Sequence, residues 1–263
     1  MPNAAWAWEF LRRNPSYARD FRAARRKPDM AIKLRTGATL LRPRKRHLTA
    51  EEWGLLHFAD PEKDALTADV FWRPDFLAGA LNVRLSAVHQ NDNGDDEDHD
   101  IIVLSAIKSR RVILDATDGA RHILLNGDRF WIQLRCEHPL PVGEQASVKI
   151  HIDGAAHARR KLDTAAQLLA LHRSASGQLS LIGRNRNAEP LRRALIAYDI
   201  WYGAGNKQGR YRRIAEAIFG APRVAEDWSQ PSRCLKDQAR RARIKGEELV
   251  AGGYRALLQK KAI

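Results

Sequence analysis

The sequence predicts an α+β fold, with a small helical N-terminal region, an antiparallel β-sheet and a helical C-terminal domain. Three observations lead to this prediction. Apolar residues recur at helical spacing in residues 1–75, alternate with polar residues in 76–158, and return to helical spacing in 159–263. A chain of 263 residues with 44% hydrophobic residues can form one large domain or two small ones.

The N-terminal region is expected to contain three short helices. The first two lie over 6–13 and 16–26, because Asn14-Pro15-Ser16 interrupts the apolar pattern and proline is favoured at a helix start. The third begins at Thr49, since Thr49-Ala-Glu-Glu52 has the pattern of a capping box, and continues through Leu56. Aromatic residues of the first two helices are expected to form an apolar side that either meets the C-terminal domain or is local core: Trp6, Trp8, Phe10, Tyr17 and Phe21.

The middle region is expected to form the sheet. Alternation and short apolar runs predict strands over 81–87, 101–107, 111–114, 122–125, 130–134 and 147–152. Asn126-Gly127, between two of these strands, is typical of a β-hairpin turn. The run 90–100 breaks every periodicity and predicts a solvent-exposed loop, and the sequence assigns no role to its acidic part, 92–100.

The final third returns to helical periodicity. Helices are expected over 162–173, 189–204 and 210–219, and over a longer segment that ends near 248. Gly220 is well placed to end the third of these helices. The longer helix can begin at Ser229 or Ser232.

The chain is strongly basic, with a formal net charge of +14 at pH 7 and a pI near 10.2. Its charge is segregated: residues 1–47 have a net charge of +10, residues 48–158 of −9, residues 159–188 of +5 and residues 189–263 of +8. Clustered cations are typical of a surface that meets phosphates, so the expected partner is a polyanion. A second, weaker possibility is that the acidic middle docks against a basic end of the same molecule.

Two consecutive helices, the second rich in Arg and Lys, indicate a helix-turn-helix over about 210–248. The link between them, 220–228, is longer than the roughly three or four residues of a standard turn, and Val224 and Trp228 are expected to hold it in place. Positions 233, 236, 240 and 243 share one face of the second helix, while Leu235 and Ala239 are expected to turn toward the core. We expect Arg233 and Lys236 to read bases, and other cations to hold the DNA backbone: Arg210, Arg212, Arg213, Arg240, Arg241 and Arg243. Lys245 is a further expected DNA contact. A basic helix that packs on its neighbours with a solvated arginine face is the alternative.

No pattern in the sequence predicts a metal site, a cofactor or a catalytic centre. The two cysteines, Cys136 and Cys234, are far apart, and the histidines lack the paired spacing of zinc ligands. The acidic run lacks the glycine and closing glutamate of a calcium-binding loop. No signal peptide or membrane span is recognised, which predicts a cytoplasmic protein. A metal-dependent nuclease is the rival class, but the converging carboxylates that it needs are missing outside the acidic loop.

Two parts of the sequence resemble a known family. Residues 211–220 and 223–228, followed by the basic helix, resemble a widespread bacterial domain that is an extended-turn variant of the helix-turn-helix. Residues 8–17, 53–55 and 70–74 are similar to the N-terminal domain that often precedes it. Together they resemble FseA-type transcriptional activators of integrative and conjugative elements.

This resemblance implies a sequence-specific DNA-binding regulator that activates genes for excision or conjugative transfer of a mobile element. In that family the positive face of the C-terminal domain binds promoter DNA and its other face contacts the N-terminal domain. Acidic stand-alone copies of the C-terminal domain act as antiactivators that compete for the N-terminal domain, so the expected partners are double-stranded DNA and such an antiactivator. The alternatives are that the chain is itself an antiactivator or, less in keeping with the sequence, a nucleic-acid-processing enzyme. The strongly basic C-terminal third favours the DNA-binding branch.

Overall fold

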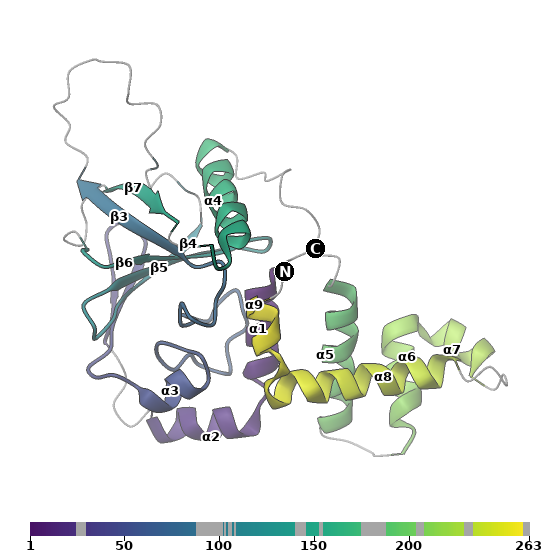
Figure 1. Cartoon of the computed structure of the whole chain (residues 1–263). Helices are drawn as coiled ribbons and strands as arrows, with labels where there is room; N and C mark the ends of the chain where they lie inside the picture. The colour runs from purple at the N-terminus through teal and green to yellow at the C-terminus, as the bar shows by residue number, and fades with distance from the viewer. Residues whose placement is uncertain are drawn as a thin grey trace.

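The computed structural model describes residues 1–24, 30–87, 102, 104, 107, 109–139, 146–152, 155–174, 188–203, 208–228 and 234–259. Within them the chain forms an α+β fold, in which a mixed sheet lies between helices (Figure 1). The N-terminal and middle elements are α1 (Asn3–Leu11), α2 (Pro15–Ala24), β1 (Met30–Lys33), β2 (Thr39–Arg42), α3 (Leu48–Glu52), β3 (Leu81–Ala87), β4 (Arg110–Asp115), β5 (Arg121–Asn126), β6 (Trp131–Cys136) and β7 (Ala146–His151). The C-terminal elements are α4 (Ala158–Arg173), α5 (Ala188–Tyr202), α6 (Arg210–Phe219), α7 (Ala221–Asp227), α8 (Cys234–Glu248), the π-helix η3 (Leu249–Gly253) and α9 (Arg255–Gln259).

The sheet has seven strands in the order β1-β2-β4-β5-β6-β3-β7. Its centre is the antiparallel meander β4-β5-β6, and the hairpin predicted at Asn126-Gly127 joins β5 to β6. The sheet is mostly antiparallel, as predicted, but the pairs β2–β4 and β3–β6 are parallel. These parallel pairs arise because strands from earlier in the chain join the meander on both of its sides.

The two faces of the sheet belong to two hydrophobic cores. On one face Ile123 and Leu125 of β5 pack in the same cluster as Leu168 and Leu171 of α4. On the other face Leu124 joins a cluster that includes α1 and the C-terminal helices. Every residue of β5 is therefore buried, because both sides of this central strand are covered.

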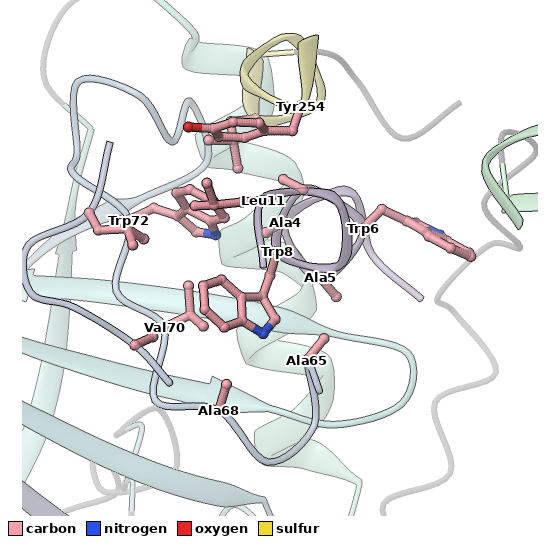
Figure 2. Packing of buried hydrophobic residues seen from close by; sticks show 14 of the residues in the cluster. Ala4, Ala5, Trp6, Trp8, Leu11, Ala65, Ala68, Val70, Trp72 and Tyr254 are labelled. Atoms are coloured by element: carbon pink, nitrogen blue, oxygen red, sulfur yellow. The ribbon is translucent and has the colours of Figure 1, made fainter. Parts of the chain in front are cut away.

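Helix α1 is the centre of the second core, and all nine of its residues are buried. Figure 2 shows Trp8 and Leu11 of this helix near Trp72, with Tyr254 from the end of the chain on the same side as Leu11. A helix that is buried on all sides is expected to contain few charged residues, and α1 has one, Glu9. The Glu9 carboxylate accepts hydrogen bonds from Arg12, Arg13 and the amide of Ala65, which compensates for its burial.

Three sequence predictions need correction. Helix α3 begins at Leu48 with no side-chain cap and ends at Glu52, so Thr49 does not cap it and it does not reach Leu56. The carboxylate of Glu51 instead pairs with Arg46, at 2.5 and 2.7 Å. The strand predicted over 101–107 is not formed at its described residues, 102, 104 and 107, which are buried against the sheet without belonging to it.

Other differences concern short elements that the sequence did not predict, namely β1, β2, α7, η3 and α9. The acidic run 92–100 lies outside the described residues. Among the helices that the structure describes, none combines the length and apolar character that a membrane span requires.

Candidate nucleic-acid interface

Helices α5 to α8 pack around a small hydrophobic core of their own. Its fully buried members come from all four helices: Ala197, Ile214, Ala215, Val224, Leu235 and Ala239. Both residues expected to hold the long link belong here, since Val224 is fully buried and Trp228 packs against the cluster. Leu235 and Ala239 face this core, as predicted, which fixes the outward side of α8.

The link between α6 and α8 is itself largely helical. Residues 221–227, predicted as part of an extended turn, form α7. Gly220 joins α6 to α7 with a φ of 90°, a conformation in which only glycine is unstrained. Pro222 lies in the first turn of α7, where its fixed φ suits a helix start. The two helices of the predicted motif are therefore separated by a third helix.

Helix α8 crosses α5 at very short range. A β-carbon built on Gly246 would lie 2.4 Å from the carbonyl oxygen of Ala194 and 3.0 Å from Cβ of Tyr198. Glycine is thus required at this position, although it is unfavourable inside a helix. This close crossing determines the orientation of α8 and of the cations on its outer side.

Three of the predicted DNA contacts form a basic row on the outer side of α8, which we call the α8 ridge: Lys236, Arg240 and Arg241. All three are exposed, and none forms an ion pair with any residue that the structure describes. Leu235 and Ala239 of the same helix are buried in the small core, whereas these three residues lie on its solvent-exposed side. Unpaired, exposed guanidinium and ammonium groups are available to bind phosphate.

Other predicted contacts on α8 and α6 are already engaged with carboxylates of their own helices. Arg243 is half-buried, pairs with Glu247, and its guanidinium lies 4.5 Å from the centre of the Trp201 ring. Arg243 therefore turns away from the α8 ridge, although its spacing from Lys236 predicted a shared face. Ion pairs within a helix also hold Lys245 to Glu248 at 2.9 Å and Arg212 to Glu216 at 3.0 Å.

The remaining predicted DNA contacts differ in exposure. Arg213 of α6 is exposed. Arg210 is half-buried and donates a hydrogen bond to the carbonyl of Trp201, so it holds α6 to the end of α5. Arg233, predicted to read a base, lies outside the described residues.

The five aromatic residues of the first two helices lie in or beside the large core. Trp6, Trp8, Phe10 and Tyr17 are buried in the cluster that also contains Leu191 of α5 and residues of η3 and α9. The indole of Trp8 donates to the carbonyl of Lys63 at 3.0 Å, and the hydroxyl of Tyr17 donates to the carbonyl of Ala59 at 2.6 Å. Phe21 is half-buried, with its ring 6.3 Å from that of Phe58.

Polar contacts that the sequence did not predict join the N-terminal helices to the C-terminal ones. Arg13 forms a two-fold ion pair with Asp199 of α5, at 2.6 and 2.8 Å. The side-chain amide of Asn14 donates to the carbonyl of Val250 at 2.9 Å in a buried environment. Their partners are 186 and 236 positions away, so no local pattern could have indicated them.

Comparison with known families decides the class of the protein. Residues 1–58 match the family model described as a proteobacterial transcriptional regulator-like domain. Residues 140–259 match the RovC-type model described as a T6SS transcription factor, DNA binding domain. The chain is a DNA-binding transcription regulator. A search of curated proteins gave no match.

The two family matches cover the surfaces that the geometry singles out. The DNA-binding match includes α8 and its ridge, and the N-terminal match includes the buried helix α1. Both families point to a regulator rather than an enzyme. The described residues contain no cluster of three or more His, Cys, Asp or Glu side chains that could hold a metal ion.

Proposed function

We propose that this regulator binds promoter DNA in a sequence-specific manner through the α8 ridge and activates transcription. One observation carries the proposal: Lys236, Arg240 and Arg241 are exposed on one helix and have no carboxylate partner among the described residues. The small core behind them holds the helix rigidly, so the cations can meet a duplex without reorganisation of the fold.

The structure supports different roles for the cations. Lys236 lies near the start of α8, where the side chains of a recognition helix reach base edges. Arg240 and Arg241 follow one turn later and are assigned to phosphates. Arg212, Arg213 and Lys245 are assigned to flanking phosphates. Arg210 and Arg243 are assigned mainly to positioning, because each is engaged with Trp201.

The target genes are proposed from the family resemblance. The resemblance to FseA-type activators supports genes for excision or conjugative transfer of a mobile element as targets. The family description that names T6SS offers a second class of target promoter. An antiactivator role would require a surface that binds another regulator rather than DNA, and the unpaired cations of the α8 ridge argue against it.

The proposal is tested by fluorescence anisotropy with labelled DNA from the chain's own upstream region and with random DNA, over a series of salt concentrations. Arg240→Gln and Arg241→Gln are each expected to weaken binding to both DNAs by about tenfold and to reduce the salt slope by about one unit. Lys236→Ala is expected to weaken binding to the cognate DNA by about 1–3 kcal/mol and to leave random DNA nearly unaffected.

The matched control is Arg84→Gln, which removes an exposed cation from β3 of the sheet. It should leave the affinity and the salt slope unchanged. Equal losses for Arg84→Gln and Arg241→Gln would contradict a specific interface on α8. An unchanged affinity in all the α8 variants would leave protein partners as the better explanation of the basic surface.

A further inference from the structure

A cavity of about 510 Å³ lies between α3 and the end of the central strands. Its size falls within the range of small-molecule sites in proteins. Strands β4, β5 and β6 contribute Leu114, His122 and Arg135, and the segments around α3 contribute Lys45, Glu51 and Arg73. The DNA-binding surface of α8 includes none of these residues, so the cavity is a separate feature of the molecule.

A buried polar group belongs to the lining of this cavity. His122 is only 1% exposed, and its Nδ1 atom has no hydrogen-bond partner. Burial lowers the pKa of the imidazole to about 4, and the nearby Arg135 adds to the effect, against Asp118. The ring is therefore neutral at pH 7, with one N–H donor and one acceptor nitrogen. A buried polar atom without a partner is costly in a folded protein.

The charge around the cavity is positive on balance. Four cations and three carboxylates line it: Lys45, Arg46, Arg73 and Arg135 against Glu51, Asp75 and Asp118. Glu51 is shared between two of the arginines, Arg46 and Arg73. Lys45 is exposed and has no ion-pair partner among the described residues, and the partner of Arg135, Glu137, is largely exposed. Leu56, Leu114 and two prolines provide an apolar wall beside these charges.

We propose that this cavity binds a small organic anion, with Lys45 and Arg135 holding its phosphate or carboxylate beside the buried ring of His122. The apolar wall favours a ligand with a carbon framework over a bare inorganic ion. A charge-assisted contact with Lys45 and Arg135 needs no rearrangement of the neighbouring pair between Arg46 and Glu51.

The same segments hold the C-terminal helices to the rest of the molecule. The carbonyl of Glu52 accepts a hydrogen bond from Arg255 at 2.6 Å, and the carbonyl of Trp53 accepts one from the hydroxyl of Tyr254 at 2.9 Å. The carbonyl of Asp75 accepts one from Gln259 at 3.3 Å. A bound anion would thus act on the segments that hold α9 and η3, which follow α8. Such an effect on DNA binding rests on the function proposed above, whereas the binding of the anion does not.

The test is an NMR titration of the free, full-length protein, in which the ring nitrogen signals of His122 are followed as inorganic phosphate, AMP or citrate is added. We expect saturable shifts of these signals with AMP or citrate, at lower concentration than with phosphate. Lys45→Gln should weaken the binding of the same probe by about tenfold, because a charge-assisted contact is lost. Lys149→Gln, which removes an exposed cation from β7, is the matched control and should leave the affinity unchanged.

The proposal is overturned if none of the three probes shifts the His122 signals in a saturable way, or if Lys45→Gln and Lys149→Gln bind the probe equally well. Lys45 is exposed, so Lys45→Gln should leave the fold intact. The test therefore does not depend on a substitution of the buried His122. The titration contains no DNA. A negative result therefore leaves DNA binding by α8 standing, and failure of the α8 variants to affect DNA binding would leave the anion site standing.

Discussion

At Gly246 the lack of a side chain allows α8 to cross α5 so closely that the backbones of the two helices are almost in contact. The residue lies in a helix, where glycine costs about 1 kcal/mol relative to alanine. The cost is tolerated because a β-carbon would meet the carbonyl oxygen of Ala194 at 2.4 Å. Backbone atoms cannot move aside as the end of a flexible side chain can. A single glycine thus connects local sequence to the orientation of the helix that is proposed to meet DNA.

Gly246→Ala is expected to lower the free energy of unfolding by about 1–3 kcal/mol, because the overpacking outweighs the gain in helix propensity. Urea denaturation followed by circular dichroism measures the change. Ile244→Ala, at an exposed position of the same helix, should change the stability by less than about 0.5 kcal/mol. A Gly246→Ala variant as stable as the parent protein would show that α5 and α8 are farther apart in solution.

The sequence predicted which residues of α8 are buried. It predicted only in part which cations of this helix are left without an ion-pair partner on its outer side. Leu235 and Ala239 follow from helical periodicity. Periodicity also placed Arg243 beside Lys236, whereas Arg243 stacks on Trp201 and pairs with Glu247. The sequence gives no information on this choice, because Trp201 comes from another helix and a long side chain can lean either way.

Among the elements, the strands of the meander were predicted well because their apolar runs are bounded by clear turn signals. β1 and β2, each four residues long, were missed. α7 was missed for a different reason. Gly220 and Pro222 are typical turn residues, but here the glycine ends α6 and the proline starts α7. Residues 102, 104 and 107 were predicted as strand because they belong to a short apolar run. They are buried, but an apolar run alone does not decide between strand and irregular structure.

β5 shows how an element's position in the sheet changes the chemistry of a side chain. Nothing in the sequence pattern of the strand sets His122 apart, yet burial lowers the pKa of its imidazole from 6.5 to about 4. The unfolded chain therefore binds a proton near pH 6.5, whereas the folded chain binds it only near pH 4. Protonation favours the unfolded state within this interval. Stability is fully present above pH 6.5 and is lost progressively as the pH falls to 4.

The loss of stability from His122 over this interval is expected to reach about 3 kcal/mol at most. His122→Asn removes the titrating group, so the pH dependence of unfolding between pH 6.5 and 4 should become shallower by that amount. Chemical denaturation at a series of pH values measures both profiles. Parallel profiles for the parent protein and the variant would contradict the burial of a neutral imidazole. His151→Asn, at an exposed position of β7, is the control and should leave the profile unchanged.

At the scale of the whole molecule, the two ends of the chain meet in one core. α1 contacts α5, η3 and α9, and Trp8 and Tyr254 belong to the same cluster. The sequence indicated an aromatic N-terminal side that could meet the C-terminal domain, but it left local core as an equal alternative. The contacts that decide between these alternatives are polar and join residues that are distant in sequence, such as the hydrogen bond from Asn14 to the carbonyl of Val250. The limits predicted for the three regions, 1–75, 76–158 and 159–263, stay a prediction. Helix α4, which falls almost entirely in the third of these regions, packs on the sheet rather than among α5 to α8.

A double-mutant cycle measures how strongly the ion pair between Arg13 and Asp199 joins the N-terminal helices to α5. Arg13→Gln and Asp199→Asn remove the two sides of an ion pair whose arginine is 18% and whose aspartate is 47% exposed. Since the pair is two-fold but half-solvated, we expect a coupling of about 1 kcal/mol in the free energy of unfolding. Arg13 also bonds to Glu9, so the single substitution should cost more than the coupling. The control cycle combines Arg13→Gln with Asp163→Asn of α4, which should show no coupling. If both cycles give the same value, the pair between Arg13 and Asp199 adds nothing to the link between the N-terminal helices and α5, and the shared core alone holds them together.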